Sequence, residues 1–293
     1  MLVAVTLVGA GAEAAATRVG SAVAQMAGAA KETSGLGPNA IDLIFEAEAI
    51  APIHLAAKDA IAEAPIDFCV QPQANRRKQL LIADMDSTLI GCECLDELAD
   101  FAGVKAEVSA ITERAMRGEI GFEGALRERV GMLKGLPIAA LEQCYAQRVR
   151  LNPGAETMVK TMAVHGARCV LVSGGFGFFT SRVVVAAGFH ADRANTLIEA
   201  DGKLTGQVGD PILGREAKLA ALQEECAALG VGLDQALAIG DGANDLAMIT
   251  AAGLGVAYRA KPVVAAEADA RIDHTDLTAL LYFQGYRAAD FWA

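Results

Sequence analysis

The chain has 293 residues, enough for about two domains with an ample hydrophobic core. Its 25 basic and 36 acidic side chains give a formal net charge of −11, which repels nucleic acid and anionic lipid surfaces. We therefore expect a small-molecule substrate, and neither a nucleic acid nor a membrane as a partner.

Residues 1–72 predict an α+β domain. The expected elements are strands near 2–7, 41–46 and 66–70, helices near 13–26 and 52–62, and an edge strand at 31–37. This βαββαβ order resembles the ferredoxin-like plait, and among such domains the ACT type that often accompanies amino-acid enzymes. The polar segment 71–78 predicts a linker into a second domain over residues 73–293.

Gly9, Gly11 and Ala14 follow the first predicted strand with the GxGxxA spacing of dinucleotide-binding turns. The roughly 70 residues before the linker are too few for a complete dinucleotide fold, which also needs an acidic residue after its second strand. We therefore interpret the motif as a glycine turn that precedes a helix.

The second domain predicts a doubly wound α/β fold with a parallel sheet. Its short apolar runs, separated by helical stretches, lie at 80–83, 168–172, 236–239, 254–257 and 270–272. In such a fold the functional side chains gather at the carboxyl ends of the strands. The first three runs do end in clusters of polar residues and glycine.

Two further segments belong to this domain. Residues 93–150 are too long for a plain crossover and show helical spacing of apolar side chains, so we expect a helical cap over the site. Residues 197–209, with Asp201 and Gly202 at the turn, predict a hairpin that flanks the sheet.

Four aspartates point to metal-assisted chemistry. On an extended strand Asp84 and Asp86 project the same way, about 7 Å apart. Asp241 and Asp245 are spaced i to i+4 and share one face if a helix begins there. Clustered carboxylates repel one another unless a cation or a proton is shared, and Mg²⁺ prefers such oxygen ligands.

Two other features carry a weaker signal. Ser173, Gly174 and Gly175 follow a strand and precede a helical stretch over 178–187, where free N–H groups favour an anion, although an ordinary helix cap has the same pattern. Lys218 is by default a surface lysine, but within this set it is the cation that would neutralise a phosphoryl oxygen.

The remaining composition suggests no other chemistry. The six cysteines form no metal-type CxxC pair, and Cys92 and Cys94 are too close for an easy disulfide, so we expect reduced thiols. The four histidines lie outside the clusters and receive no role. The N-terminus has no basic segment and no apolar run reaches the roughly 18 residues of a membrane span, which predicts a soluble, cytoplasmic protein.

The order DxDST at Asp84, SGG at Ser173, Lys218 and GDGxxD ending at Asp245 resembles the haloacid dehalogenase superfamily. Within it, Glu93, residues 115–118, Phe122, residues 126–130 and Phe176 resemble the phosphoserine phosphatase family. The likeness covers residues 80–284 and implies the haloacid dehalogenase-like fold.

The resemblance also implies roles. Asp84 would be the nucleophile and Asp86 the general acid and base. Mg²⁺ would be held by the Asp84 carboxylate, the Asp86 backbone carbonyl and Asp241, with Asp245 close behind. The phosphoryl group and its surroundings would be held by Ser173, Gly174, Lys218 and Asn244. From the cap, Glu93 would meet a substrate ammonium and Arg129 its carboxylate, with Met116 and Phe122 lining the lid.

The function so implied is Mg²⁺-dependent hydrolysis of O-phospho-L-serine through an aspartyl-phosphate, the last step of serine synthesis. Two alternatives stay open: phosphotransfer to an acceptor alcohol such as homoserine, and a non-enzymatic amino-acid sensor with an inert core. The role of the first domain is equally open between serine binding, assembly of a homodimer and support of folding.

Overall fold

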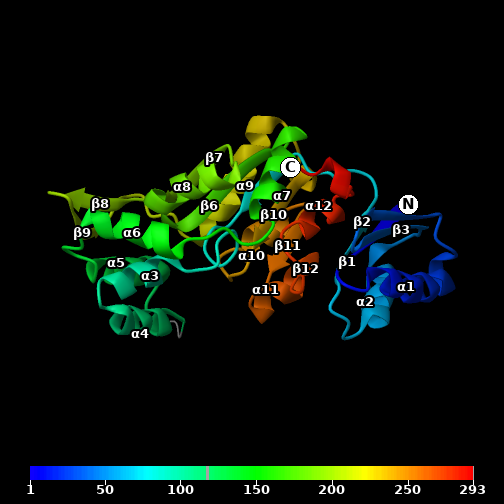
Figure 1. Ribbon diagram of the computed structural model, residues 1–293, viewed down its shortest axis with the longest axis horizontal. Helices are drawn as coiled ribbons and strands as arrows, with labels where there is room; N and C mark the ends of the chain where they lie inside the picture. The colour runs from blue at the N-terminus through cyan, green and yellow to red at the C-terminus, as the bar shows by residue number, and fades with distance from the viewer. Residues whose placement is uncertain (117–118, 293) are drawn as a thin grey trace.

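A computed structural model of the chain describes residues 1–116 and 119–292, without the side chain of Met116. Arg117 and Gly118 of the resemblance motif, and the predicted lid contribution of the Met116 side chain, therefore lie outside the described residues. The molecule is elongated, with the N-terminal segment at one end, a central sheet, and the helical insert at the other end (Figure 1).

The first 72 residues form the predicted βαββαβ order: β1 (Leu2–Val8), α1 (Ala12–Ala27), β2 (Glu32–Gly37), β3 (Ala40–Glu46), α2 (Ile50–Ile61) and β4 (Asp67–Pro72). The sheet order is β2-β3-β1-β4 with antiparallel pairs throughout. Val5, Leu7, Val19 and Ile53 belong to a hydrophobic cluster that joins α1 and α2 to the sheet.

Gly9 and Gly11 turn the chain from β1 into α1, with φ angles of +140° and +92° that favour glycine. Because β1 pairs only antiparallel with β3 and β4, the parallel βαβ unit of a dinucleotide site is not formed here. The glycine-turn interpretation of this motif therefore agrees with the backbone.

The central sheet is parallel, in the order β12-β11-β10-β5-β6-β7. Its strands are β5 (Leu80–Ala83), β6 (Arg168–Phe176), β7 (Ala191–Asn195), β10 (Ala236–Gly240), β11 (Leu254–Tyr258) and β12 (Ala270–Ile272). The doubly wound prediction is confirmed, with the addition of edge strand β7, whose half-buried, polar sequence ADRAN gives no strand pattern.

Helices cover both faces of this sheet. One face packs on α7 (Ala155–Val164), α8 (Gly177–Ala187) and α12 (Ala279–Phe283), and the other on α9 (Arg215–Leu229), α10 (Leu246–Ala251) and α11 (Pro262–Glu267). Along β5, Leu81 and Ala83 face the first set while Leu80 and Ile82 face the second, as strand alternation requires. Short 3-10 turns lie at Leu233–Gln235 and Ala288–Asp290.

The two sheets join into one of ten strands, because β4 pairs antiparallel with β12 at Cys69 and Ala270. The predicted linker, residues 71–78, is ordered and packed against the fold. Gln71 and Pro72 end β4, and Lys78 is buried, with its Nζ donating to the Asp234 carbonyl at 2.8 Å. Polar composition suggested exposure, but Gln71 and Lys78 are buried and donate to the backbone carbonyls of Phe283 and Asp234.

The insert forms the predicted helical cap, with α3 (Cys94–Phe101), α4 (Lys105–Met116), α5 (Phe122–Gly131) and α6 (Ile138–Arg148). The hairpin β8 (Leu197–Ala200) and β9 (Lys203–Val208) forms as predicted, but it flanks the cap rather than the sheet (Figure 1). Gly135 N–H donates to the Leu204 carbonyl and Leu204 N–H donates to the Leu136 carbonyl. The hairpin edge is therefore hydrogen-bonded to the backbone of the cap.

Candidate active site

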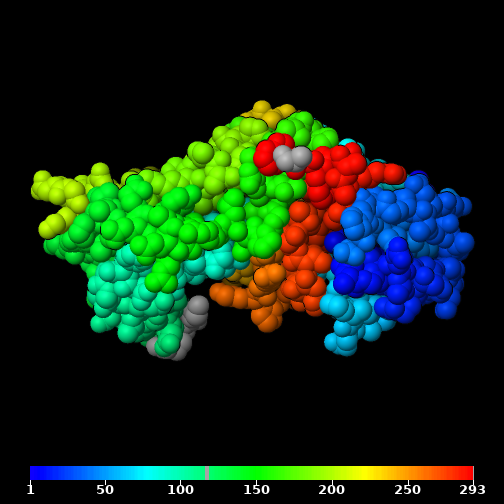
Figure 2. Space-filling view, in the orientation of Figure 1, coloured from blue at the N-terminus to red at the C-terminus, as the bar shows by residue number. Residues whose placement is uncertain are grey.

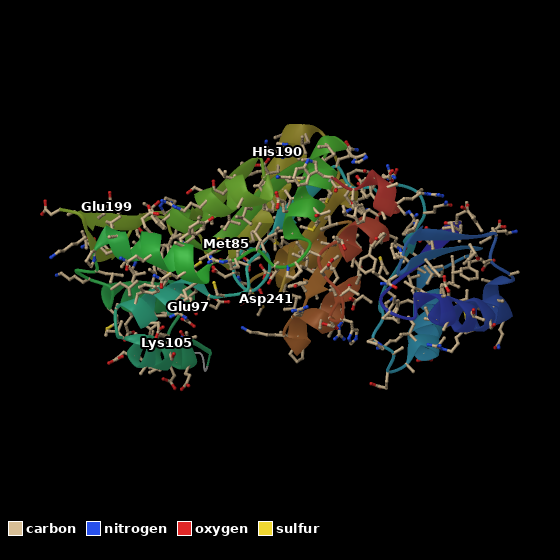
Figure 3. The ribbon with its side chains drawn as sticks, in the orientation of Figure 1. Met85, Glu97, Lys105, His190, Glu199 and Asp241 are labelled. Atoms are coloured by element: carbon tan, nitrogen blue, oxygen red, sulfur yellow. The ribbon has the colours of Figure 1, made fainter. Side chains whose placement is uncertain are left out.

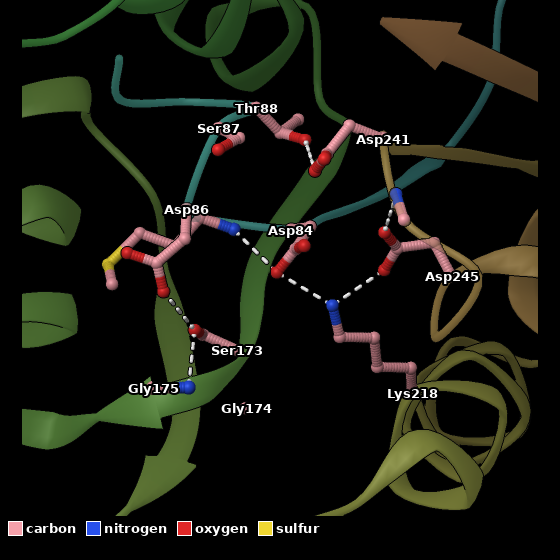
Figure 4. A network of polar contacts seen from close by, with 12 residues as sticks. Asp84, Asp86, Ser87, Thr88, Ser173, Gly174, Gly175, Lys218, Asp241 and Asp245 are labelled. Atoms are coloured by element: carbon pink, nitrogen blue, oxygen red, sulfur yellow. Dashed lines mark hydrogen bonds and ion pairs between the residues drawn. The ribbon is translucent and has the colours of Figure 1, made fainter. Parts of the chain in front are cut away.

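Polar side chains from three neighbouring strands meet at one edge of the sheet. β5 lies between β10 and β6, so the residues after Ala83, around Ser173 and after Gly240 are brought together (Figure 4). The chain turns sharply after β5, where Ser87 has a φ of +55°, and its N–H donates to the Cys92 carbonyl. The carboxyl ends of parallel strands therefore build the site, as the sequence predicted.

Lys218 lies at the base of this cluster. Its Nζ is 2.7 Å from Asp84 Oδ1 and 2.5 Å from Asp245 Oδ1, and its side chain is 2% exposed. The second oxygen of Asp245 accepts the Gly242 N–H at 3.0 Å. Lys218 is thus a buried ion-pair partner and not the surface lysine of the default interpretation.

The carboxylates fit a hard divalent cation. One oxygen each from Asp84, Asp241 and Asp245 lies within 4.8 Å of the others, the only donor type is oxygen, and Lys218 offsets only part of the charge. A turn, rather than a helix face, brings Asp241 and Asp245 together, because α10 begins at Leu246. The shared-helix prediction was wrong in this detail, although the convergence it predicted occurs.

Asp86 has hydrogen-bond partners that the other carboxylates do not share. β5 ends at Ala83, so strand alternation no longer applies, and Asp86 Oδ1 accepts the Cys94 N–H at 3.0 Å. Its Oδ2 lies 3.5 Å from Ser173 Oγ, which itself accepts the Gly175 N–H at 2.9 Å. The chain is therefore not a regular strand through both aspartates, as the prediction assumed; Asp84 and Asp86 have separate hydrogen-bond partners, but both residues line the same cavity (Figure 4).

Ser173 and Gly174 lie near the carboxyl end of strand β6, which runs to Phe176 before α8 begins at Gly177. This differs from the predicted strand-to-helix turn, because the strand continues through the glycines. Asn195 Nδ2 donates to the Gly174 carbonyl at 2.8 Å and holds this segment in place.

A cavity of about 400 Å³ opens over these groups, between the core and the cap. Its lining includes the predicted residues Asp84, Asp86, Glu93, Arg129, Ser173, Gly174, Asp241 and Asn244, together with Phe122. In the space-filling view the outline is indented between the α4 region and the α11 region (Figure 2). Lys218 and Asp245, which were also predicted at the site, do not line the cavity.

Of the predicted residues, the cap supplies the acid Glu93 and the forked cation Arg129. Glu93 Oε1 accepts the Ser87 hydroxyl at 2.6 Å, which ties the cap entrance to the DxDST segment. Arg129 is half-buried and donates through Nε to the Ala125 carbonyl at 3.2 Å, while its guanidinium lines the cavity. An ammonium and a carboxylate of one small molecule match these two groups.

Burial shifts the titration of the site. Burial, with the nearby Glu93 charge, raises the pKa of Asp86 to about 7. Burial, with Asp245, raises the pKa of Asp241 to about 6. Burial also raises the pKa of Asp84, against the opposing charge of Lys218. Burial lowers the pKa of Lys218, but its two carboxylate partners outweigh this and raise it.

Sequence reasoning missed several lining residues. Asp96 and Thr112 of the cap and Lys261 of the core line the cavity, and the Thr88 hydroxyl donates to Asp241 Oδ1 at 3.0 Å. Thr88 stands in the DxDST motif, so the motif itself was the signal available for it. The sequence assigned no role to the histidines. Consistent with this, His190 lies far from the site residue Asp241 in Figure 3, and its ring accepts the Cys169 N–H.

The fold and this site define a phosphoric monoester hydrolase, and comparison with known proteins agrees. The sequence matches the haloacid dehalogenase-like hydrolases over residues 81–250, more than half of the chain. The phosphoserine phosphatase of Polaromonas sp. (strain JS666) is 49% identical over 208 residues, which cover 69% of this chain and 88% of that protein. The chain therefore belongs to the haloacid dehalogenase-like hydrolase family, and its sequence places it with the phosphoserine phosphatases.

Solved structures give the same answer. A haloacid dehalogenase family hydrolase from Salmonella enterica serovar Typhi has a TM-score of 0.86 and 28% identity, with 96% of this chain and 98% of that chain covered. A structure titled as a phospho-aspartyl intermediate analogue of phosphoserine phosphatase has a TM-score of 0.65 and 40% identity, covering 70% and 98%. Among the described residues, no helix is both long and apolar enough to cross a membrane.

Proposed function

We propose that this chain is a Mg²⁺-dependent phosphoserine phosphatase that hydrolyses O-phospho-L-serine to serine and phosphate, the last step of serine synthesis. The observation that carries the proposal is one cavity lined by Asp84 and Asp86 on the core side and by Glu93 and Arg129 on the cap side. The names of the Polaromonas relative and of the solved phospho-aspartyl analogue support the same substrate and intermediate.

Asp84 is the nucleophile in this proposal. Its Oδ1 accepts the Met85 N–H at 2.8 Å and contacts Lys218, whereas Oδ2 has no hydrogen bond or ion pair among the described residues and can attack phosphorus in line. The new Asp84–phosphorus bond forms as the bond from phosphorus to the serine oxygen breaks. The rigid backbone and the buried lysine hold the attacking carboxylate in one orientation.

Asp84, Asp241 and the Asp86 carbonyl would hold Mg²⁺, with Asp245 close behind. The ion, when bound, offsets the charge that develops on the phosphoryl oxygens. Ser173, the Gly174 N–H and Asn244 line the cavity beside this point and would hold the phosphoryl group. Lys218 keeps Asp84 and Asp245 in place and adds positive charge beneath it.

Asp86 serves both half-reactions. With its pKa near 7 it is largely protonated in mildly acidic solution and half protonated near neutrality. It first donates a proton to the departing serine oxygen, and then accepts one from the water that attacks the aspartyl-phosphate. The Cys94 N–H fixes one of its oxygens, so the other carries the proton.

The cap recognises the amino-acid part of the substrate. Glu93 would bind the substrate ammonium and Arg129 its carboxylate, while the cap shields the reacting centre from bulk solvent. We also propose residues 1–72 as a separate domain of ACT type and residues 73–293 as the phosphatase domain, since the first segment has its own hydrophobic cluster.

Phosphate release from O-phosphoserine with Mg²⁺ tests the proposal. The wild type should turn over, and Asp84→Asn should lose nearly all activity, with Asp59→Asn, an exposed aspartate on α2, as the matched control. Undiminished turnover by Asp84→Asn would remove the nucleophile. Release of phosphohomoserine in place of phosphate, when homoserine is added, would favour phosphotransfer over hydrolysis.

Arg129→Ala tests the substrate class. KM for phosphoserine should rise about 100-fold, while KM for a phosphate ester without a carboxylate should change little. Equal effects on both esters would reject Arg129 as the carboxylate clamp.

A further inference from the structure

Lys261 is a cavity-lining cation that no motif of the sequence singled out. It is exposed, lines the cavity on the core side and belongs to the segment between β11 and α11. Within the described part of the chain, the cavity lining has two basic side chains, Arg129 and Lys261, against five acidic ones. Lys218 is not among them, because it lies beneath the carboxylates.

The fold places Lys261 beside the metal-binding turn. Its backbone N–H donates to the Asp241 carbonyl at 3.0 Å, and its own carbonyl accepts the Val264 and Ala265 N–H groups at the start of α11. Two residues earlier, Arg259 has a φ of +44°, a conformation that non-glycine residues adopt only where the surroundings hold them. The loop therefore fixes the backbone from which this flexible side chain reaches the cavity.

The position of Lys261 suits an interaction with the phosphoryl end of a bound ligand. Lys261 shares its side of the cavity with Asp241, Gly242 and Asn244, all from the turn after β10, whereas Arg129 approaches from the cap. A phosphate ester that reacts at Asp84 has its phosphorus on the core side. A lysine ammonium suits such a group, since it needs no forked geometry to meet three oxygens.

We propose that Lys261 is a phosphate-binding residue, whose ammonium group meets the dianionic phosphoryl group of the substrate and of the phosphate product. The inference rests on the proposed function in that it takes the cavity as the site of a phosphate ester. It assigns to the core a second cation besides Lys218, one that faces open solvent. Lys261 also offsets the acidic lining for an anion that approaches a chain of net charge −11.

Kinetics of Lys261→Ala, Lys261→Arg and the control Lys203→Ala, on the exposed hairpin, test this proposal. With Mg²⁺, Lys261→Ala should raise KM for phosphoserine about 5-fold with kcat nearly unchanged, and Lys261→Arg should restore it. The same factor should appear for phosphoethanolamine, which has no carboxylate. The effect should shrink at high ionic strength, because an exposed charge is screened.

Inorganic phosphate separates this inference from the proposed function. Calorimetric titration of the Mg²⁺-loaded protein with phosphate should show about 5-fold weaker binding to Lys261→Ala than to wild type or Lys203→Ala. Equal binding and equal KM would overturn the inference and leave the phosphatase proposal intact. A penalty with phosphoserine alone would also overturn it, since the lysine would then meet the carboxylate. If phosphoserine is not hydrolysed at all, the proposed function fails, and phosphate binding still decides the role of Lys261.

Discussion

Lys218 Nζ lies 2.7 Å from Asp84 Oδ1 in a site where neither side chain is more than 8% exposed. The lysine also pairs with the fully buried Asp245, so one cation holds two acids from different strand ends. The carboxylate proposed to attack phosphorus is therefore positioned by a buried ion pair, and its charge is offset even without a metal ion.

We expect Lys218→Met to destabilise the metal-free protein by about 3 kcal/mol, because two buried carboxylates lose their cation. Urea unfolding measures this change. Lys31→Met removes an exposed ion pair with Glu46 and should cost at most about 0.5 kcal/mol. Unfolding of Lys218→Met at the wild-type urea midpoint would show that the pair does not stabilise the fold.

Gly175→Ala should disturb Asp86 without a backbone penalty. A Cβ at Gly175 would lie 2.9 Å from Asp86 Oδ2 and 3.0 Å from Ser173 Oγ, so Asp86, the proposed general acid, must move. We expect kcat to fall about 10- to 100-fold with little change in Tm. Gly177→Ala is the matched control, since its Cβ would meet only the Asn195 carbonyl at an ordinary 3.8 Å. Equal losses in both variants would contradict this account.

The stability of the metal-free protein should rise as pH falls from 8 to 5. Burial raises the pKa of Asp86 to about 7 and that of Asp241 to about 6, above the ordinary aspartate value of 3.8. In this window the folded state takes up protons that the unfolded state does not, so this stability is lost as pH rises through about 6 to 7. Tm of the chelator-treated protein measures it, and Asp241→Asn should flatten the profile. A Tm that falls steadily from pH 8 to 5 in both proteins would refute the assignment.

Asp67 should be a main stabiliser of the junction between the two sheets. Its buried carboxylate accepts the N–H groups of Asp273, His274 and Thr275, and the Thr275 hydroxyl at 2.6 Å. Asp67→Ala removes the acceptor of these partly exposed donors and should cost about 2 kcal/mol by urea unfolding. Asp59→Ala, on the exposed face of α2, should cost less than about 0.5 kcal/mol. Equal changes in the free energy of unfolding for both variants would show that the Asp67 hydrogen bonds do not stabilise the junction.

Local pattern predicted most of the elements. The runs at Leu80–Ala83 and Ala236–Gly240 are buried strands, because continuous apolar sequence of that length suits a sheet covered on both faces. Edge strand β7 escaped prediction because polar, half-buried residues carry no such pattern. The hairpin β8–β9 was predicted as an element, but its partner, the cap, is remote in sequence and could not be read from the turn.

The candidate site was also predicted only in part. The order of the polar clusters and the parallel sheet together indicated which residues meet, since parallel strands place their carboxyl ends at one edge. The directions of Asp84 and Asp86 depend on how the chain leaves β5 at Ala83, and that turn is set by partners such as Cys92 and Cys94.

The amino-acid sequence by itself determined the alternation of strands and helices and the residue types at the strand ends, because hydrophobic periodicity and turn chemistry act over a few neighbouring residues. Only the tertiary structure decided that Lys218 is buried between two acids, that Asp86 faces Ser173, and that Lys261 lines the cavity. Those outcomes depend on contacts between segments far apart in the chain, whose burial and charge exist only once the sheet has assembled.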